Sequence, residues 1–113
     1  LGYNVVTMDE FQTRGIDDVI KELLDKIGDN PLYITFDLDS LDASVAPAVA
    51  NIEPGFTGFT IDEAKALIQS VKNKNVIGGD VVCLMPTKDQ KNNITSMVAA
   101  SVMFEIISVI AYK

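Results

Sequence analysis

The sequence predicts an α/β protein in which a parallel sheet carries helices on its faces. Short β-branched or apolar runs alternate with amphipathic helical patterns, in the order strand, helix, strand, helix, strand, helix. Each pair of consecutive strands is separated by a helix-length segment, which favours right-handed parallel crossovers. The chain has 113 residues, of which 48% are hydrophobic. This length suits one domain over residues 1–113, with enough apolar side chains for a core.

The first elements come before a short acidic segment. Residues 4–8 (NVVTM) form a β-branched run that is typical of a strand. Apolar side chains recur at helical spacing over residues 16–27, and Gly28 is a typical helix end. The apolar run LYITF at residues 32–36 predicts a strand buried on both faces, and the segment DLDSLD follows it at residues 37–42.

A long loop and a capped helix follow. Residues 43–59 show no periodicity, and they contain the breakers Pro47, Pro54, Gly55 and Gly58. Loops of this length in compact domains usually carry function. Thr60 and Glu63 form the Thr-x-x-Glu pattern of a capping box, which predicts a helix that continues to Val71.

The last elements are a strand and a strongly apolar helix. Residues 76–84 (VIGGDVVCL) predict a third strand, which Gly78 and Gly79 could interrupt. Asp80 could lie near a metal site or be a structural hydrogen-bond acceptor, and we expect the second, while Lys88 and Asp89 are typical of a solvated turn. A helix is predicted over residues 94–110, and three side chains could cap it: Asn92, Asn93 and Thr95.

This apolar helix raises the question of a membrane span. Residues 94–112 contain one charged residue, Glu105, and approach the ~20 residues that a bilayer requires. The polar residues within the segment favour a helix covered by neighbouring elements instead. We therefore expect no membrane association, and we expect Glu105 to face a polar partner in the fold or at a subunit interface.

The composition restricts the kinds of function. Sixteen Asp and Glu residues against nine Lys and Arg give a net charge of −7, which argues against a nucleic-acid surface. A single cysteine, Cys83, cannot form an internal disulfide, so we expect a reducing, cytoplasmic setting. The chain has no histidine, which excludes histidine-based catalysis or metal ligation by this chain alone. It begins at Leu1 without the pattern of a signal peptide, which we interpret as the middle of a longer protein.

Two carboxylates stand at the end of the LYITF strand. Asp37 and Asp39 are two residues apart, so their side chains are expected on one face with Cα atoms ~6.5–7 Å apart. Such a pair could ligate one hard divalent cation or bridge two. Spacing alone favours solvated acids that cap the next turn. An EF-hand is excluded, because Leu41 stands where a ligand belongs and Asp42 where glycine belongs.

Longer motifs around these acids resemble those of the ureohydrolase family, which comprises the arginases, agmatinases and formiminoglutamases. The run TFDLDSLDASVAPA at residues 35–48 resembles the family's Asp-x-Asp signature, with Thr35 in place of the usual serine. The run GDVVCLMPTKD at residues 79–89 resembles its late strand, and residues 53–55 (EPG) are closer to agmatinases and formiminoglutamases. The resemblance implies a three-layer α/β/α, arginase-like fold with a parallel sheet, of which this chain is the C-terminal βαβαβα part.

The resemblance also implies an activity and a set of site residues. Family members hydrolyse a guanidino or formimino C–N bond of arginine, agmatine or formiminoglutamate through a metal-bridging hydroxide. Asp37 and Asp39 match two ligands of the family's binuclear manganese (Mn2+) site. The implied partners are a small-molecule amidine substrate and further copies of the chain in a homo-oligomer, with no nucleic acid and no membrane.

Two departures from the family keep alternatives open. The other metal ligands of the family, histidines among them, lie in elements upstream of the region that this chain matches, so this chain alone cannot complete the site. The substrate-binding glutamate of the family aligns with Cys83, which by itself could be a small core residue or a reactive thiolate. Besides an active hydrolase, the chain could therefore belong to an inactive, ureohydrolase-like binding or regulatory protein. A third interpretation is a small acidic module that holds a structural cation with Asp37, Asp39 and Asp42.

Overall fold

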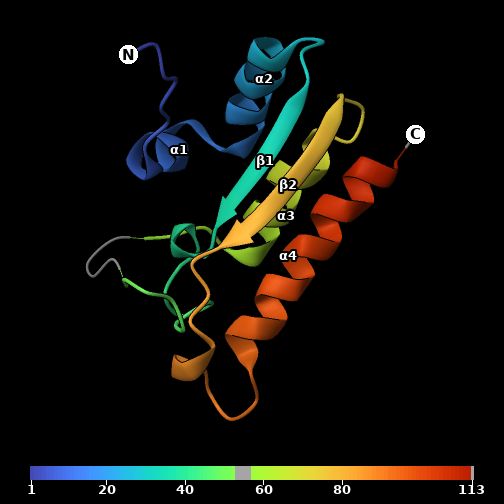
Figure 1. The fold of residues 1–113 in the computed structure, drawn as a ribbon. Helices are drawn as coiled ribbons and strands as arrows, with labels where there is room; N and C mark the ends of the chain where they lie inside the picture. The colour runs from blue at the N-terminus through green and yellow to red at the C-terminus, as the bar shows by residue number, and fades with distance from the viewer. Residues whose placement is uncertain (53–56, 113) are drawn as a thin grey trace.

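The computed structural model describes residues 1–52 and 57–112, and in this part of the chain it contains four α-helices and two strands (Figure 1). Two short 3-10 helices follow the strands. The elements in chain order are α1 (Met8–Arg14), α2 (Ile16–Ile27), β1 (Leu32–Asp37), η1 (Leu38–Ser40), α3 (Ile61–Ser70), β2 (Val76–Val82), η2 (Pro86–Lys88) and α4 (Ile94–Ala111).

The two strands lie side by side and run parallel, as the sequence predicts. Helix α3 forms the crossover between them. The register shifts between Leu32 and Tyr33, which leaves Ile77 as an extra residue in β2. Gly78 and Gly79 therefore do not interrupt the strand, and the irregularity is a bulge at the residue before them.

The core lies between the sheet and three helices, α2, α3 and α4, which pack on the same face. Its fully buried members come from α3, β2 and α4: Ile68, Val71, Val76, Val102, Ile106 and Val109. Alternate residues of β1 point toward this core, and the residues between them are exposed. Tyr33 on the outer face is 55% exposed, so the expectation that LYITF is buried on both faces is wrong within the described chain.

The strand expected at residues 4–8 is also absent from the described residues. Helix α1 begins at Met8 instead, because Thr7 caps it by accepting a hydrogen bond from the Glu10 N–H at 3.1 Å. A strand requires a neighbour for its backbone hydrogen bonds. Val5 is 73% exposed and has no ladder partner in the described part of the chain. The strand was predicted from the side chains of five residues. That prediction overlooked the Thr-x-x-Glu pattern of Thr7 and Glu10, which marks the start of a helix here as it does at Thr60.

The two middle helices follow their sequence signals closely. At α3, Thr60 Oγ1 accepts from the Glu63 N–H at 3.1 Å, and Glu63 Oε1 accepts from the Thr60 N–H at 3.2 Å. This reciprocal pair is the predicted capping box. Helix α2 ends at Gly28, whose φ of 55° lies in the left-handed region that favours glycine. Both predictions are confirmed.

Helix α4 is capped by a residue that the sequence had placed in a solvated turn. The carboxylate of Asp89 accepts hydrogen bonds from the Thr95 N–H at 3.1 Å and the Ser96 N–H at 2.8 Å. It also accepts from the Ser96 hydroxyl at 2.6 Å. These donors lower the pKa of Asp89 to about 2. Asn93, the residue at the cap position, makes no side-chain cap, so the expectation of an asparagine cap there is wrong.

By length and composition alone, α4 could cross a membrane, with a mean hydropathy of 2.0. This is weak evidence, because the core helices of many proteins have the same properties. One side of α4 lies in the core, and its charged residue is paired within the fold. Glu105 accepts from Gln69 Nε2 at 2.9 Å and lies 3.7 Å from Lys65 Nζ. The expectation of a polar partner in the fold is confirmed.

The loop after η1 returns to its own starting point. The Phe59 N–H donates to the Ser40 carbonyl at 2.9 Å, and the Asp42 N–H donates to the Phe59 carbonyl at 3.0 Å. Gly58 is required at this crossing, because a Cβ there would lie 2.2 Å from the Asp42 nitrogen. The EPG segment at residues 53–55 lies outside the described residues. The loop thus holds η1 beside the start of α3.

Candidate functional site

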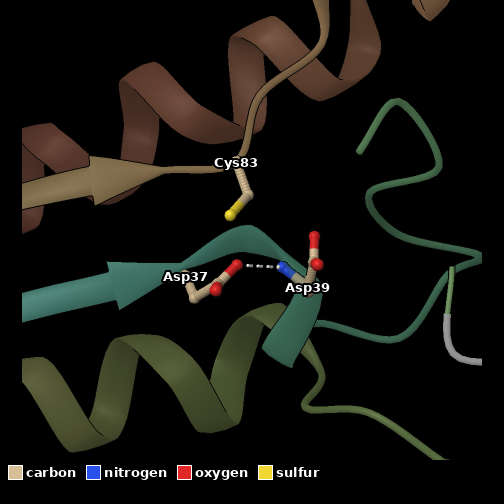
Figure 2. Close-up of side chains that lie close together, drawn as sticks. All are labelled: Asp37, Asp39 and Cys83. Carbon is tan, nitrogen blue, oxygen red and sulfur yellow. Dashed lines mark hydrogen bonds between the residues drawn. The ribbon is translucent and has the colours of Figure 1, made fainter. Parts of the chain in front are cut away.

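The two strands bring their carboxyl ends to the same edge of the sheet, because they are parallel neighbours. Asp37 is the last residue of β1 and pairs with Val82, the last residue of β2. Asp39 lies in η1, and Cys83 directly follows β2. Figure 2 shows the three side chains converging at this edge.

The three side chains form a compact group. One ligand atom from each of Asp37, Asp39 and Cys83 lies within 4.8 Å of the others. Asp37 is exposed, and the other two are partly buried. Asp37 Oδ1 accepts from the Asp39 N–H at 2.9 Å, and the Ser40 hydroxyl donates to the Asp37 carbonyl at 2.6 Å. The Asp39 N–H thus orients the Asp37 carboxylate, and the structure brings together the two acids that the sequence singled out.

Cys83 does not belong to the hydrophobic core. It is partly buried at the edge of the sheet, and its sulfur points toward Asp37 (Figure 2). The interpretation as a small core residue is therefore wrong. A hydrogen bond to Asp37, burial, and the negative charges of Asp37 and Asp39 raise the pKa of the thiol. These surroundings favour the neutral thiol, unlike those of a reactive cysteine.

Two other acids near this edge serve the fold. Asp42 accepts from the Ser44 N–H at 3.0 Å and hydroxyl at 2.6 Å, and from the Gly58 N–H at 3.3 Å. These donors lower the pKa of Asp42, and they occupy its carboxylate with the loop. Asp80 accepts from the Tyr33 hydroxyl at 3.1 Å, as expected of a structural acceptor. Asp42 is therefore engaged by the loop, which argues against its sharing a cation with Asp37 and Asp39.

A cavity of about 470 Å³ adjoins Asp39. Asp39 and Ser40 contribute to one side of it, and the other walls are mostly apolar side chains from α1, α2 and the loop. They include Phe11, Val19, Leu41 and Phe59. The N-terminal segment also contributes Val6 to the lining. Sequence reasoning did not place residues 6–8 beside Asp39, because no local signal reports a contact made across the chain.

The donor set decides which chemistry this edge could support. Carboxylate oxygens are the ligands that hard divalent cations such as Mn2+ or Mg2+ prefer. Asp37 and Asp39 therefore fit such a cation. A thiol suits softer metals, so Cys83 does not match the same preference. Within the described residues, the edge offers three ligand groups, fewer than a closed metal site requires.

Comparisons with known proteins place this arrangement in a family. The model of the arginase family matches residues 1–108. An agmatinase from Enterobacter sp. is 37% identical over 112 residues, covering 99% of this chain and 36% of that protein. The structure of a proclavaminate amidino hydrolase from Streptomyces clavuligerus superposes with a TM-score of 0.90 and 32% identity, over 98% of this chain and 37% of the other.

A third match comes from another activity in the same family. The structure of formimidoylglutamase from Bacillus subtilis gives a TM-score of 0.82 and 33% identity, over 94% of this chain and 33% of that chain. The arginase-like α/β fold is thereby confirmed. The chain spans about a third of the length of these relatives.

Proposed function

The chain belongs to the arginase family, and on this premise we propose that it supplies two metal ligands to a ureohydrolase that cleaves a guanidino or formimino C–N bond. The observation that carries the proposal is the convergence of Asp37 and Asp39 at the carboxyl edge of the sheet. Ligand sites in parallel α/β sheets occur at this edge. Since the chain spans about a third of its relatives, the activity belongs to the whole polypeptide that contains it.

The roles of the two acids follow from their charge and position. Asp37 and Asp39 would hold Mn2+, and the Asp39 N–H would keep the Asp37 carboxylate turned toward the ion. A bound divalent cation lowers the pKa of water and so supplies a hydroxide nucleophile near neutral pH. Neutral amides in these positions would not offset the charge of the cation. The remaining ligands would come from elsewhere in the polypeptide.

The substrate class is a small, linear amidine. Relatives named agmatinase, proclavaminate amidino hydrolase and formimidoylglutamase support this class, and they differ among themselves in substrate. We propose arginine, agmatine and formiminoglutamate as the compounds to test first. The cavity beside Asp39, with its mostly apolar walls, is where we would place the methylene chain of such a substrate.

A second candidate function rests on Cys83. A neutral thiol cannot form an ion pair with a guanidinium group, which a carboxylate at the same place could do. An inactive, ureohydrolase-like protein that binds a ligand or regulates a partner would retain the fold with this change. If so, Cys83→Glu alone should restore no turnover, unless the other metal ligands are intact in the polypeptide.

The test uses the full-length polypeptide that contains this chain, purified and loaded with Mn2+. Release of urea or formamide from the three compounds is measured for the wild type, for Asp37→Asn and for Asp39→Asn. We expect turnover in the wild type and a loss of at least ~100-fold in each variant, because each removes a direct ligand of the ion. The control is Asp25→Asn, an exposed acid on α2, which should retain wild-type activity. Absence of turnover with all three compounds would favour the inactive alternative.

Two further properties are proposed for the whole protein. We propose a homo-oligomer, since large apolar side chains remain exposed on the outer face of the sheet and on α4. We also propose a cytoplasmic setting, because a thiol beside a metal site persists best under reducing conditions. Light scattering of the purified full-length protein tests the first property, and fractionation of its source cells tests the second.

A further inference from the structure

Cys83 is the third member of the group at the sheet edge, and the proposed function of the two acids assigns it no role. Its Sγ lies within 4.8 Å of a carboxylate oxygen of Asp37 and of Asp39. A metal–sulfur bond of ~2.3 Å and a metal–oxygen bond of ~2.1 Å place such atoms ~3.6 Å apart at a tetrahedral angle. The group would have to contract by about 1 Å, which rotation of Asp and Cys side chains can supply.

The backbone holds Cys83 in an unusual conformation. Its φ is 73°, in the left-handed region that residues other than glycine seldom adopt. The sulfur nevertheless points inward, toward the carboxylate of Asp37 (Figure 2). The chain is held in place before Cys83 by the pairing of Val82 with Asp37, and after it by the Met85 N–H, which donates to the Ala48 carbonyl at 2.9 Å. The thiol is thus held next to both acids by the fold, without a contribution from the hydrophobic core.

We propose that Cys83 is a direct ligand of the cation held by Asp37 and Asp39, and that its sulfur shifts the site toward thiophilic divalent metals such as Zn2+ or Co2+. This inference rests on the proposed function of the two acids. Thiolate sulfur favours zinc and cobalt over manganese, whereas carboxylates alone favour the harder ion. On binding, the S–H bond breaks, the sulfur lone pair forms the metal–sulfur bond, and the proton passes to solvent. No oxidation or reduction is involved.

The experiment titrates Co2+ into the full-length polypeptide after removal of metals by a chelator. Thiolate ligation of Co2+ produces a sulfur-to-metal charge-transfer band in the near ultraviolet. We expect this band in the wild type and its loss in Cys83→Ser, which keeps the size of the side chain and replaces sulfur by oxygen. Removing a group that only hydrogen-bonds to a metal ligand already lowers the affinity for the metal ~10–100-fold. We therefore expect Cys83→Ser to weaken Zn2+ binding by at least ~10-fold and to leave Mn2+ binding within about 2-fold.

The outcomes separate this inference from the proposed function. Co2+ binding without the band, or with the same band in Cys83→Ser, overturns the role of Cys83 and leaves the two acids as ligands. No binding of Co2+, Zn2+ or Mn2+ overturns both. Asp37→Asn should abolish binding of all three metals, whereas Cys83→Ser should change only the preference among them.

A measurement without variants covers the case in which Cys83→Ser does not fold. X-ray absorption at the zinc edge of the wild-type protein should contain a sulfur neighbour at ~2.3 Å. A shell of nitrogen and oxygen alone would contradict the proposal.

Discussion

Asp89 stabilises α4 from outside the helix. It lies shortly before the helix and accepts hydrogen bonds from two backbone N–H groups of its first turn. These groups have no partner inside a helix, and a negative charge is favourable beside them. Ser96 adds a hydroxyl donor to the same carboxylate. Asp89, which the sequence placed in a solvated turn, therefore caps α4 in place of the expected asparagine.

This contact makes the stability of the fold depend on pH. The pKa of Asp89 falls from 3.8 to about 2 on folding. A lowered pKa means that the stabilisation is present above the unfolded value of 3.8 and is lost as the pH falls through about 2. We expect Asp89→Asn to lower the urea midpoint of unfolding clearly at pH 7 and much less at pH 2.

The control is again Asp25→Asn on the exposed side of α2, which should change the midpoint little at either pH. Equal destabilisation by Asp89→Asn at pH 7 and pH 2 would show that the charge has no part in the effect. The wild type and the variant are compared in the same full-length polypeptide.

Single functional residues could be predicted from the sequence where their position at the end of a strand determines their neighbours. Asp37 and Asp39 could be identified because a strand end and a spacing of two residues put both on one edge. Asp89 could not be, because its partners come within reach only when the turn before α4 folds back. The left-handed backbone of Cys83 was equally hidden, since nothing in the sequence signals it.

At the scale of elements, α4 packs directly on β2. A Cβ at Gly79 would lie 2.7 Å from Ile106 Cγ2 and 2.8 Å from the Ile34 carbonyl oxygen. Glycine therefore allows the helix to approach the sheet directly. Ile106 is fully buried at this contact, with 0% exposure. The packing of α4 on β2 holds the strand whose end positions Cys83.

We expect Ile106→Ala to lower the free energy of unfolding by about 2–5 kcal/mol, because it removes buried methyl groups and leaves a cavity. Ile107 is the matched control: it is the same residue type, one position further along the helix, and 56% exposed. Ile107→Ala should change the free energy by no more than about 0.5 kcal/mol. Urea denaturation followed by circular dichroism measures both, and similar losses for the two variants would contradict the assigned core.

The elements were predictable where a full set of local signals agreed. Helix α2 has an apolar stripe and a terminal glycine, and its observed bounds equal the predicted ones. Helix α3 has its capping box. Residues 4–8 carried a single strand signal, the β-branched side chains of Val5, Val6 and Thr7. A strand also needs a neighbour, which no local pattern can supply. The Thr7 cap therefore determines the structure there, and α1 forms instead.

At the scale of the whole molecule, the described chain has one covered and one open face of its sheet. Helices α2, α3 and α4 cover the inner face, and the outer face carries Tyr33 and Ile77, which are 55% and 63% exposed. The parallel order of strands and helices was predictable from the alternation of patterns. The predicted three-layer arrangement has helices on both faces of the sheet, whereas the described residues place helices on one face only. A layer on the outer face would have to come from other residues.

The outer face and α4 both expose large apolar side chains. Ile77 is 63% exposed, and Phe104 on α4 is 68% exposed. Large exposed apolar patches and open strands favour association. The 113-residue chain expressed alone should therefore form oligomers or aggregates at micromolar concentration, as measured by size-exclusion chromatography with light scattering.

Variants identify the surface responsible for this association. Ile77→Lys and Phe104→Lys place a charge on each apolar face, and combining them should shift the chain toward monomer. Gln12→Lys, at an exposed polar position of α1 outside both apolar faces, is the control and should leave the association unchanged. The interpretation as an autonomous acidic module predicts the opposite result, a stable monomer that binds calcium or magnesium on its own. A monodisperse wild-type chain with a single cooperative unfolding transition would decide for that module and against the view that this surface is covered in the complete protein.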